Sequence, residues 1–163
     1  MRAYFRAGNY TKAIICADAV RQAVTEEQQV LEADYIKAKS LWTLGERAQA
    51  KDLLEKLVAK SMLPEGAEAA YLLVLDAYDE GDFDLVEERV YALSDTGTPQ
   101  LYWLAKSFIV LGDAFAEREE WEQAEATFRS VLDEYQPSGD TDDVLAQVKM
   151  RLDRLSSAQV ITK

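Results

Sequence analysis

The feature that most constrains this chain is a turn that returns at a nearly constant spacing. Gly8, Gly45, Gly81 and Glu119 each separate two apolar stretches, and they follow one another at intervals of 37, 36 and 38 residues. Within the stretches, as in residues 108–132, apolar side chains recur three and four positions apart, which is one face of an amphipathic helix. A self-similar period in the mid-thirties is typical of helical solenoids, in which each unit is a pair of helices.

The pattern therefore predicts an all-α fold of antiparallel helix pairs joined by short turns. The predicted helices span 10–23, 26–44, 47–61, 66–80, 83–94, 99–118, 121–135 and 141–157, with a partial helix before Gly8. Pro99 suits the first position of a helix, and Asp82 suits the N-cap after Gly81. Glycine tolerates positive φ at a helix end, so we expect the turn at Glu119 to close differently. Gly112 and Ala124 are small because another helix packs against them.

These units resemble tetratricopeptide repeats. The last unit supplies the small and large residues of the family pattern at Gly112, Phe115, Trp121, Ala124 and Phe128, with Glu119 in place of a glycine. The second unit supplies Ala38, Leu41, Gly45, Ala50 and Leu54, with Arg47 where the family has an aromatic residue. The third unit supplies Gly81, Phe83 and Val90, while Val74, Ala77 and Val86 depart from the pattern in size.

The resemblance implies a single domain over residues 1–163, a right-handed solenoid of stacked antiparallel helix pairs. Its parts are a partial repeat at 1–25, repeats at 26–63, 64–97 and 98–137, and a capping helix at 140–158. In the capping helix, Asp140 or Thr141 is the expected N-cap. The expected inner stripe of that helix consists of Val144, Val148, Leu152 and Leu155.

The first repeat matches the family pattern from Tyr4 onward, so its first helix would begin about ten residues before Met1. We interpret the chain as a C-terminal fragment of a longer bacterial multi-repeat protein; the alternative is a naturally short first helix. Apolar residues at 1–25, among them Tyr4 and Ile14, would then be exposed and would favour a homodimer.

In the family, the first helices of the pairs line a concave groove that binds extended segments of partner proteins. The resemblance places this groove at Phe5, Tyr35, Lys39, Trp42, Tyr71, Leu75, Tyr78, Ile109 and Asp113. Five of the nine are aromatic, and aromatic residues dominate binding hot spots; the alternative is that several are buried between helices. We expect a partner acid to lie near Lys39, and Trp121 to lie inside its helix pair. Tyr35, Ile36 and Leu72 replace the residues of a carboxylate clamp, which is therefore not supported.

Composition excludes several kinds of chemistry. The chain has no histidine and a single cysteine, Cys16, which excludes a Ser-His-Asp triad, a His-ligated metal and an intrachain disulfide. The stretch 76–88 is acidic, but Tyr78 occupies a position where an EF-hand loop needs an oxygen ligand. We therefore predict a protein that is not an enzyme and has no cofactor and no metal. The alternative function is a purely structural or self-associating segment of a longer scaffold.

The charge is uneven along the chain. The net charge is −12, yet residues 1–60 carry +2 and residues 61–163 carry −14. This distribution argues against nucleic acid and allows a basic protein partner. No apolar run approaches the length of a membrane span, and no signal peptide is visible. The stretch 64–73 resembles repeats of bacterial envelope assembly proteins, so localisation stays open between the envelope or periplasm and the cytoplasm.

Overall fold

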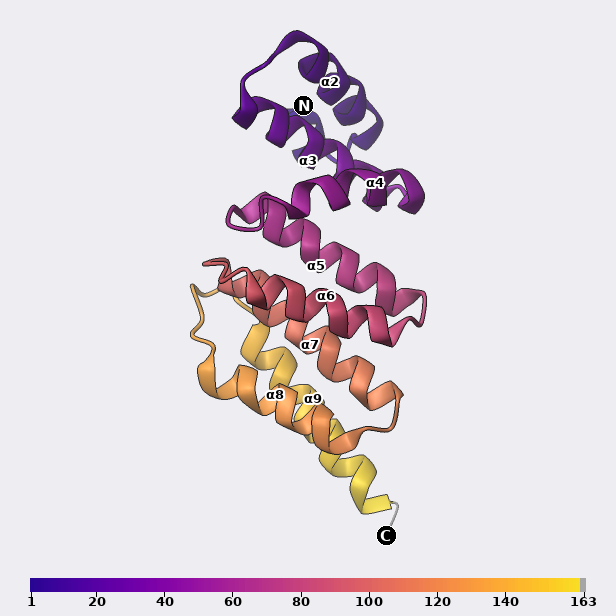
Figure 1. The fold of residues 1–163 in the computed structure, drawn as a ribbon, viewed down its shortest axis with the longest axis vertical. Coiled ribbons are helices and arrows are strands. Elements are labelled where there is room, and N and C mark those ends of the chain that lie inside the picture. The colour runs from indigo at the N-terminus through magenta and orange to yellow at the C-terminus, as the bar shows by residue number, and fades with distance from the viewer. Residues whose placement is uncertain (162–163) are drawn as a thin grey trace. The chain divides into compact units, whose positions relative to one another are not determined.

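The structure is a computed structural model that describes residues 1–161. In these residues it consists of nine α-helices and contains no strand, which confirms the predicted all-α class (Figure 1). The helices are α1 (Arg2–Arg6), α2 (Tyr10–Ala23), α3 (Glu27–Thr43), α4 (Arg47–Val58), α5 (Pro64–Asp79), α6 (Phe83–Asp95), α7 (Leu101–Glu117), α8 (Trp121–Glu134) and α9 (Val144–Ile161).

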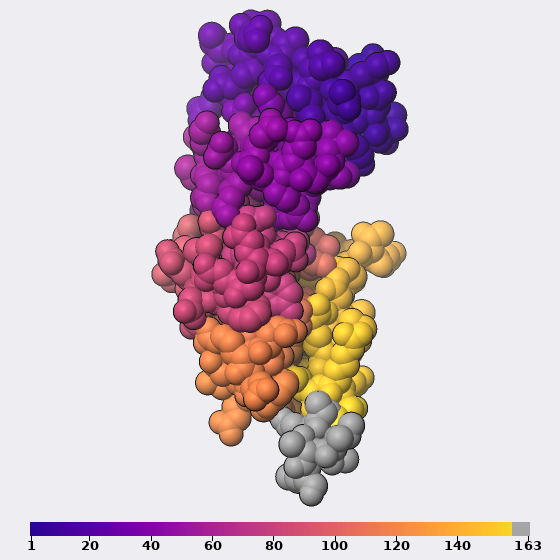
Figure 2. Space-filling view, turned by 90° about the vertical axis from the view of Figure 1, so that its right-hand side faces the viewer, coloured from indigo at the N-terminus to yellow at the C-terminus, as the bar shows by residue number. Residues whose placement is uncertain are grey.

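The chain forms two compact units, and the boundary between Leu73 and Val74 falls inside α5. In the first unit, α1 packs against α2 and α3, and α3 packs against both α2 and α4. In the second unit, α7 packs against α6, α8 and α9, and α9 also lies along α8 (Figure 2, yellow beside orange). The pairs α1–α2, α3–α4 and α7–α8 are thus neighbours in space, as the predicted helix pairs require.

The four turns within the helix pairs share one backbone geometry. The residues at their centres have positive φ, 73° at Gly8, 80° at Gly45, 75° at Gly81 and 60° at Glu119. In each turn the N–H of this residue donates to the carbonyl three residues back, and the next N–H donates to the carbonyl five residues before it. This is the Schellman closure of a helix C-terminus. The expectation that Glu119 closes its turn differently is therefore wrong, because the hydrogen bonds hold a non-glycine residue in the left-handed region.

Small residues allow close helix packing inside the second unit. A Cβ added at Gly112 of α7 would clash with the ring of Phe128 on α8. Ala124 on α8 is completely buried, and the Phe128 residue is only 1% exposed. The prediction that Gly112 and Ala124 are small because a helix packs against them is consistent with these contacts. In the first unit, Gly66 lies in the first turn of α5, and a Cβ added there would clash with the backbone of Lys60, which precedes the helix.

Helix starts show two departures from the sequence prediction. Helix α7 begins at Leu101, and Pro99 lies before it, because the buried Thr98 hydroxyl accepts from the N–H of Gln100 at 3.2 Å and holds a turn there. Helix α9 begins at Val144, and its N–H donates to the Asp142 carboxylate at 3.1 Å. The predicted cap at Asp140 or Thr141 is therefore wrong.

Other predicted features of the helix ends and of α9 are confirmed. The side chain of Asp82 accepts from the N–H of Leu85 at 3.1 Å and caps α6. On α9, Val144 and Val148 are completely buried and Leu155 is nearly so. These three residues form the inner stripe that a terminal helix needs when its other face is polar. Leu152, the fourth residue of the predicted stripe, is only partly buried.

Candidate functional site

In the first unit, three of the predicted groove residues meet around one buried carboxylate. Tyr35 and Lys39 lie one turn apart on α3, and Glu68 on α5 is 8% exposed. The Tyr35 hydroxyl donates to Glu68 Oε2. Lys39 Nζ lies 2.8 Å from Glu68 Oε1 and donates to the Tyr35 hydroxyl oxygen at 3.3 Å. Phe5 on α1 completes the cluster, with its ring centroid 5.6 Å from Lys39 Nζ.

The electrostatics of this cluster favour a neutral tyrosine beside an ion pair. Burial raises the pKa of Tyr35 far above its ordinary value, and the hydrogen bond to Glu68 and the charges of Glu68 and Glu65 raise it further. Tyr35 therefore remains a hydrogen-bond donor at any physiological pH. Because Glu68 already neutralises Lys39, this lysine is not the uncompensated cation that the sequence analysis expected to meet a partner acid.

Trp42 and Tyr71, the other two predicted residues of this unit, are partly buried. The guanidinium of Arg47, the first residue of α4, lies 3.4 Å from the centroid of the Trp42 ring. This is the geometry of a cation–π stack, and it covers one face of the indole. Trp42 is not fully buried, so part of its surface remains exposed.

In the second unit, the four predicted groove residues differ in burial and in their contacts. Leu75 and Tyr78 on α5 are partly buried. Ile109 on α7 is 1% exposed and belongs to the core, so its assignment to a binding surface is wrong. Asp113 accepts from Nε of Arg151 on α9 through both of its oxygens, at 2.7 and 2.8 Å. One N–H is thus shared between two carboxylate oxygens in a charge-assisted hydrogen bond, which ties Asp113 to α9.

Tyr78 lies in the field of that ion pair. Burial raises the pKa of its hydroxyl, and the carboxylates of Asp113 and Glu117 raise it further, while Arg151 acts in the opposite direction. A neutral phenol beside two carboxylates and an arginine can donate or accept a hydrogen bond, and it cannot act as a base near neutral pH.

Two charged residues one helical turn before predicted groove residues were not among the predicted site residues. Glu68 lies three residues before Tyr71, and Lys106 lies three residues before Ile109, so each precedes a predicted groove residue by one helical turn. Lys106 Nζ lies 3.5 Å from Asp143 Oδ2, and the Tyr102 hydroxyl is 3.3 Å from Asp143 Oδ1. Arg151 could not be found from the repeat pattern, because it lies on the capping helix outside the repeats.

The described residues do not form a metal site or a membrane-spanning helix. Within residues 1–161, no three His, Cys, Asp or Glu side chains are grouped so that they could hold a metal ion. No helix in the same range combines the length and the apolar character that crossing a bilayer requires. The partly exposed groups are aromatic rings with polar tips and a hydrogen-bonded ion pair, which are groups that protein interfaces use.

Comparison with known families decides what kind of repeat this is. Two models of the tetratricopeptide repeat match the chain, over residues 35–85 and 101–138. The chain belongs to the tetratricopeptide repeat family. No curated protein and no solved structure matches it significantly. The first matched range runs from the middle of α3 to the start of α6, and the second includes the pair α7–α8.

Three of the four helix pairs in this tetratricopeptide repeat chain share a contact across the turn. A ring on the last turn of the first helix meets the first residue of the second helix, five positions later. The ring centroids are 5.5 Å apart for Phe5 and Tyr10 and 5.7 Å apart for Tyr78 and Phe83. In the third pair, the guanidinium carbon of Arg47 lies 3.4 Å from the centroid of the Trp42 ring. Arg47, which departs from the family pattern, thus replaces an aromatic ring with a planar cation.

Trp121 lacks this contact. The residue five positions before it is Ala116, which has no ring to offer, and Trp121 is 40% exposed. Its assignment to the interior of the helix pair is therefore wrong. The interior of that pair is occupied by Phe128 and Ala124 instead.

Proposed function

We propose that the chain is a protein-interaction module that catalyses nothing and binds an extended segment of a partner on its first-helix surface. Each unit contributes a surface of its own: that of the first unit comprises Phe5, Tyr35, Lys39, Trp42 and Tyr71, and that of the second unit comprises Leu75, Tyr78 and Asp113. The observation that carries the proposal is the Tyr35–Lys39–Glu68 cluster, which holds aromatic rings in fixed positions at a partly exposed surface. Preorganised aromatic side chains bind with a small loss of entropy.

The charge state of the cluster refines the kind of contact. An ammonium group has three donors, and Lys39 uses two of them on Glu68 and Tyr35. Because Glu68 compensates the charge, a backbone carbonyl of the partner is a better acceptor here than a carboxylate. An extended segment presents such carbonyls regularly, and its apolar side chains can lie against Trp42 and Tyr71.

The test uses two tryptophans of the same chain. Random short peptides are selected on the immobilised full chain, and each binder is measured against Trp42→Ala and Trp121→Ala. Both residues are partly exposed, but Trp121 lies outside the proposed surface. For first-helix binders we expect an affinity loss of about 2 kcal/mol, or about 30-fold, with Trp42→Ala and less than about 2-fold with Trp121→Ala. If every binder tolerates Trp42→Ala, the proposal fails.

The alternative function, a self-associating structural segment, has one observation in its favour. Ile15 on α2 is 62% exposed and Tyr4 on α1 is 41% exposed. Exposed apolar side chains favour association when they form one patch. Under this alternative, light scattering would give a dimer mass for the parent chain and a monomer mass for Ile15→Lys. A monomer at every concentration of the parent chain would eliminate it.

A further inference from the structure

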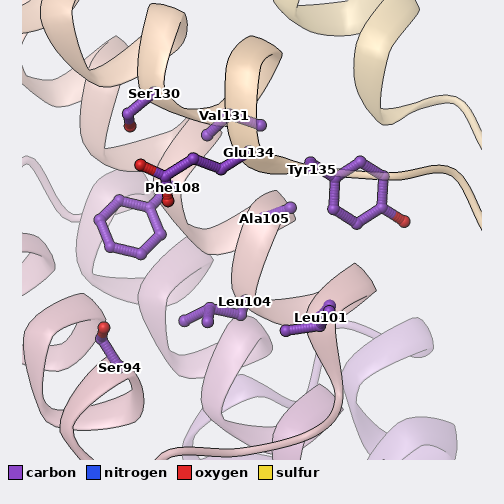
Figure 3. A pocket seen from close by; sticks show the side chains of 9 residues that line it. All are labelled: Ser94, Leu101, Leu104, Ala105, Phe108, Ser130, Val131, Glu134 and Tyr135. Carbon is purple, nitrogen blue, oxygen red and sulfur yellow. The ribbon is translucent and has the colours of Figure 1, made fainter.

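The second unit contains a cavity of 290 Å³ where the last turn of α6, the first half of α7 and the end of α8 meet (Figure 3). Its lining is largely apolar and includes Leu101, Leu104 and Phe108 of α7 and Val131 of α8. The side chain of Glu134 extends from α8 towards the ring of Phe108. Small-molecule pockets start at about 300 Å³, so this cavity suits one or two protein side chains.

This cavity belongs to a different surface from the one proposed above. Two of the three helices that line it, α6 and α8, are the second helices of their repeats. On α7 the cavity uses Leu104 and Phe108 together with Leu101 and Ala105. Asp113, nine residues after Leu104 and five after Phe108, points to a roughly opposite side of the same helix. A ligand in the cavity would therefore leave the first-helix surface unoccupied.

Exposed apolar groups extend the cavity at its rim. Leu101 is 57% exposed, and Tyr91 on α6 is 46% exposed. The Tyr91 ring meets the Phe108 ring edge to face, with 6.4 Å between centroids. Together the cavity and these two residues form an apolar patch, which we call the second-helix patch. Contiguous exposed apolar surface of this kind marks interaction sites.

The second-helix patch carries an uncompensated negative charge at Glu134. Among residues 1–157, whose side chains the structure describes, Glu134 has no ion-pair or hydrogen-bond partner. The sequence around it, residues 113–143, contains eleven acidic and two basic residues. Both basic residues are paired with acids of this stretch, Arg118 with Glu120 at 2.8 Å and Arg129 with Glu125 at 2.7 Å, while Asp113 and Asp143 pair with cations outside it. A ligand that brings its own positive charge would meet complementary potential here.

We propose that the second-helix patch docks a basic partner segment, which inserts one bulky apolar side chain into the cavity and places an adjacent Lys or Arg against Glu134. The apolar side chain gains burial against Leu104, Phe108 and Val131. The cation gains a carboxylate at the edge of an apolar site, where pairing is stronger than in open water. Large side chains that fill pockets on a partner, such as Trp, Tyr and Arg, are the residues that contribute most of the binding energy at protein interfaces.

The experiment is a peptide selection in which the Leu101→Asp chain serves as soluble competitor. Random short peptides displayed on phage are panned on the immobilised full chain while the competitor removes every binder that does not need the patch. Leu101 is more exposed than buried, so the competitor keeps the fold and all other surfaces. The surviving peptides are synthesised, and their affinities are measured by fluorescence anisotropy.

We expect the survivors to share a bulky apolar residue next to Lys or Arg. Glu134→Arg should weaken them at least about tenfold, while Glu122→Arg, a charge reversal elsewhere on α8, should change affinity less than about twofold. Trp42→Ala should leave these peptides unaffected, which separates this proposal from the first-helix surface. The absence of survivors, survivors without basic residues, or equal effects of Glu134→Arg and Glu122→Arg would each overturn the proposal.

Discussion

At the scale of single residues, Glu119 holds a conformation that its side chain disfavours. Among the described residues it is the non-glycine position with positive φ, and the same turn elsewhere uses glycine. A left-handed conformation costs an L-residue about 1–2 kcal/mol, and part of that cost returns when glycine loses its greater freedom on folding. Glu119→Gly should therefore raise the free energy of unfolding by about 1 kcal/mol, measured by urea denaturation. Glu122→Gly, within α8, should lower it by a similar amount.

A second residue-scale prediction compares the two large aromatics of α8. Phe128 is 1% exposed against Gly112, and Trp121 is 40% exposed. Phe128→Ala should lower the free energy of unfolding by about 3–5 kcal/mol. Trp121→Ala should cost less than about half of that, because truncation leaves no closed cavity. Equal losses in urea denaturation would show that Trp121 contributes to the interior after all.

At the scale of the element, the start of α9 depends on one carboxylate. Burial opposes ionisation of Asp142, but hydrogen bonds from the Tyr135 hydroxyl and from the N–H groups of Ser138 and Val144 outweigh it and hold the pKa of Asp142 below its usual range. Burial, and then the bond to Asp142, raises the pKa of Tyr135 to about 12. The pair therefore consists of a neutral phenol and an ionised carboxylate at neutral pH.

This arrangement predicts how stability changes with pH. A folded pKa below the unfolded one stabilises the fold fully above the unfolded value, about 3.9, and the gain is lost as pH falls through the folded pKa. Asp142→Ala should lower the free energy of unfolding by about 1 kcal/mol at neutral pH. The difference from the parent chain should shrink below about pH 4. Asp140→Ala, which removes an exposed carboxylate nearby, should have little effect at either pH.

Elements were more predictable than the contacts between them. Helix α2 was predicted at the residues it occupies, because Gly8 and the apolar period define it locally. Two local features were missed: Thr98 holds the turn that delays α7, and Trp121 is exposed where no ring stands at Ala116. The repeat pattern predicted the first-helix surface, but it could not show that Glu68 pairs with Lys39, since this tertiary contact joins two repeats.

At the scale of the whole molecule, charge is distributed unequally between the ends of the chain. The excess of acidic residues lies after residue 60, where the net charge is −14. Some of these acids are engaged; Arg118, for example, lies 2.9 Å from Asp84 and 3.6 Å from Glu87. Others, such as Glu122 and Asp133 on α8, are exposed. Like charges that are not compensated repel one another and oppose the compact state.

Salt should therefore stabilise this protein rather than destabilise it. Raising NaCl from about 10 mM to about 150 mM shortens the screening length from about 30 Å to about 8 Å. That change weakens the long-range repulsion among the exposed acids more than the close ion pairs, such as Arg151 with Asp113 at 2.7 Å. The melting temperature, followed by circular dichroism, should rise by a few degrees over this range. A double variant with Glu122→Lys and Asp133→Lys should show a smaller rise, because it carries less repulsion to screen. A melting temperature that falls with salt would mean that the ion pairs contribute more to stability than the repulsion removes.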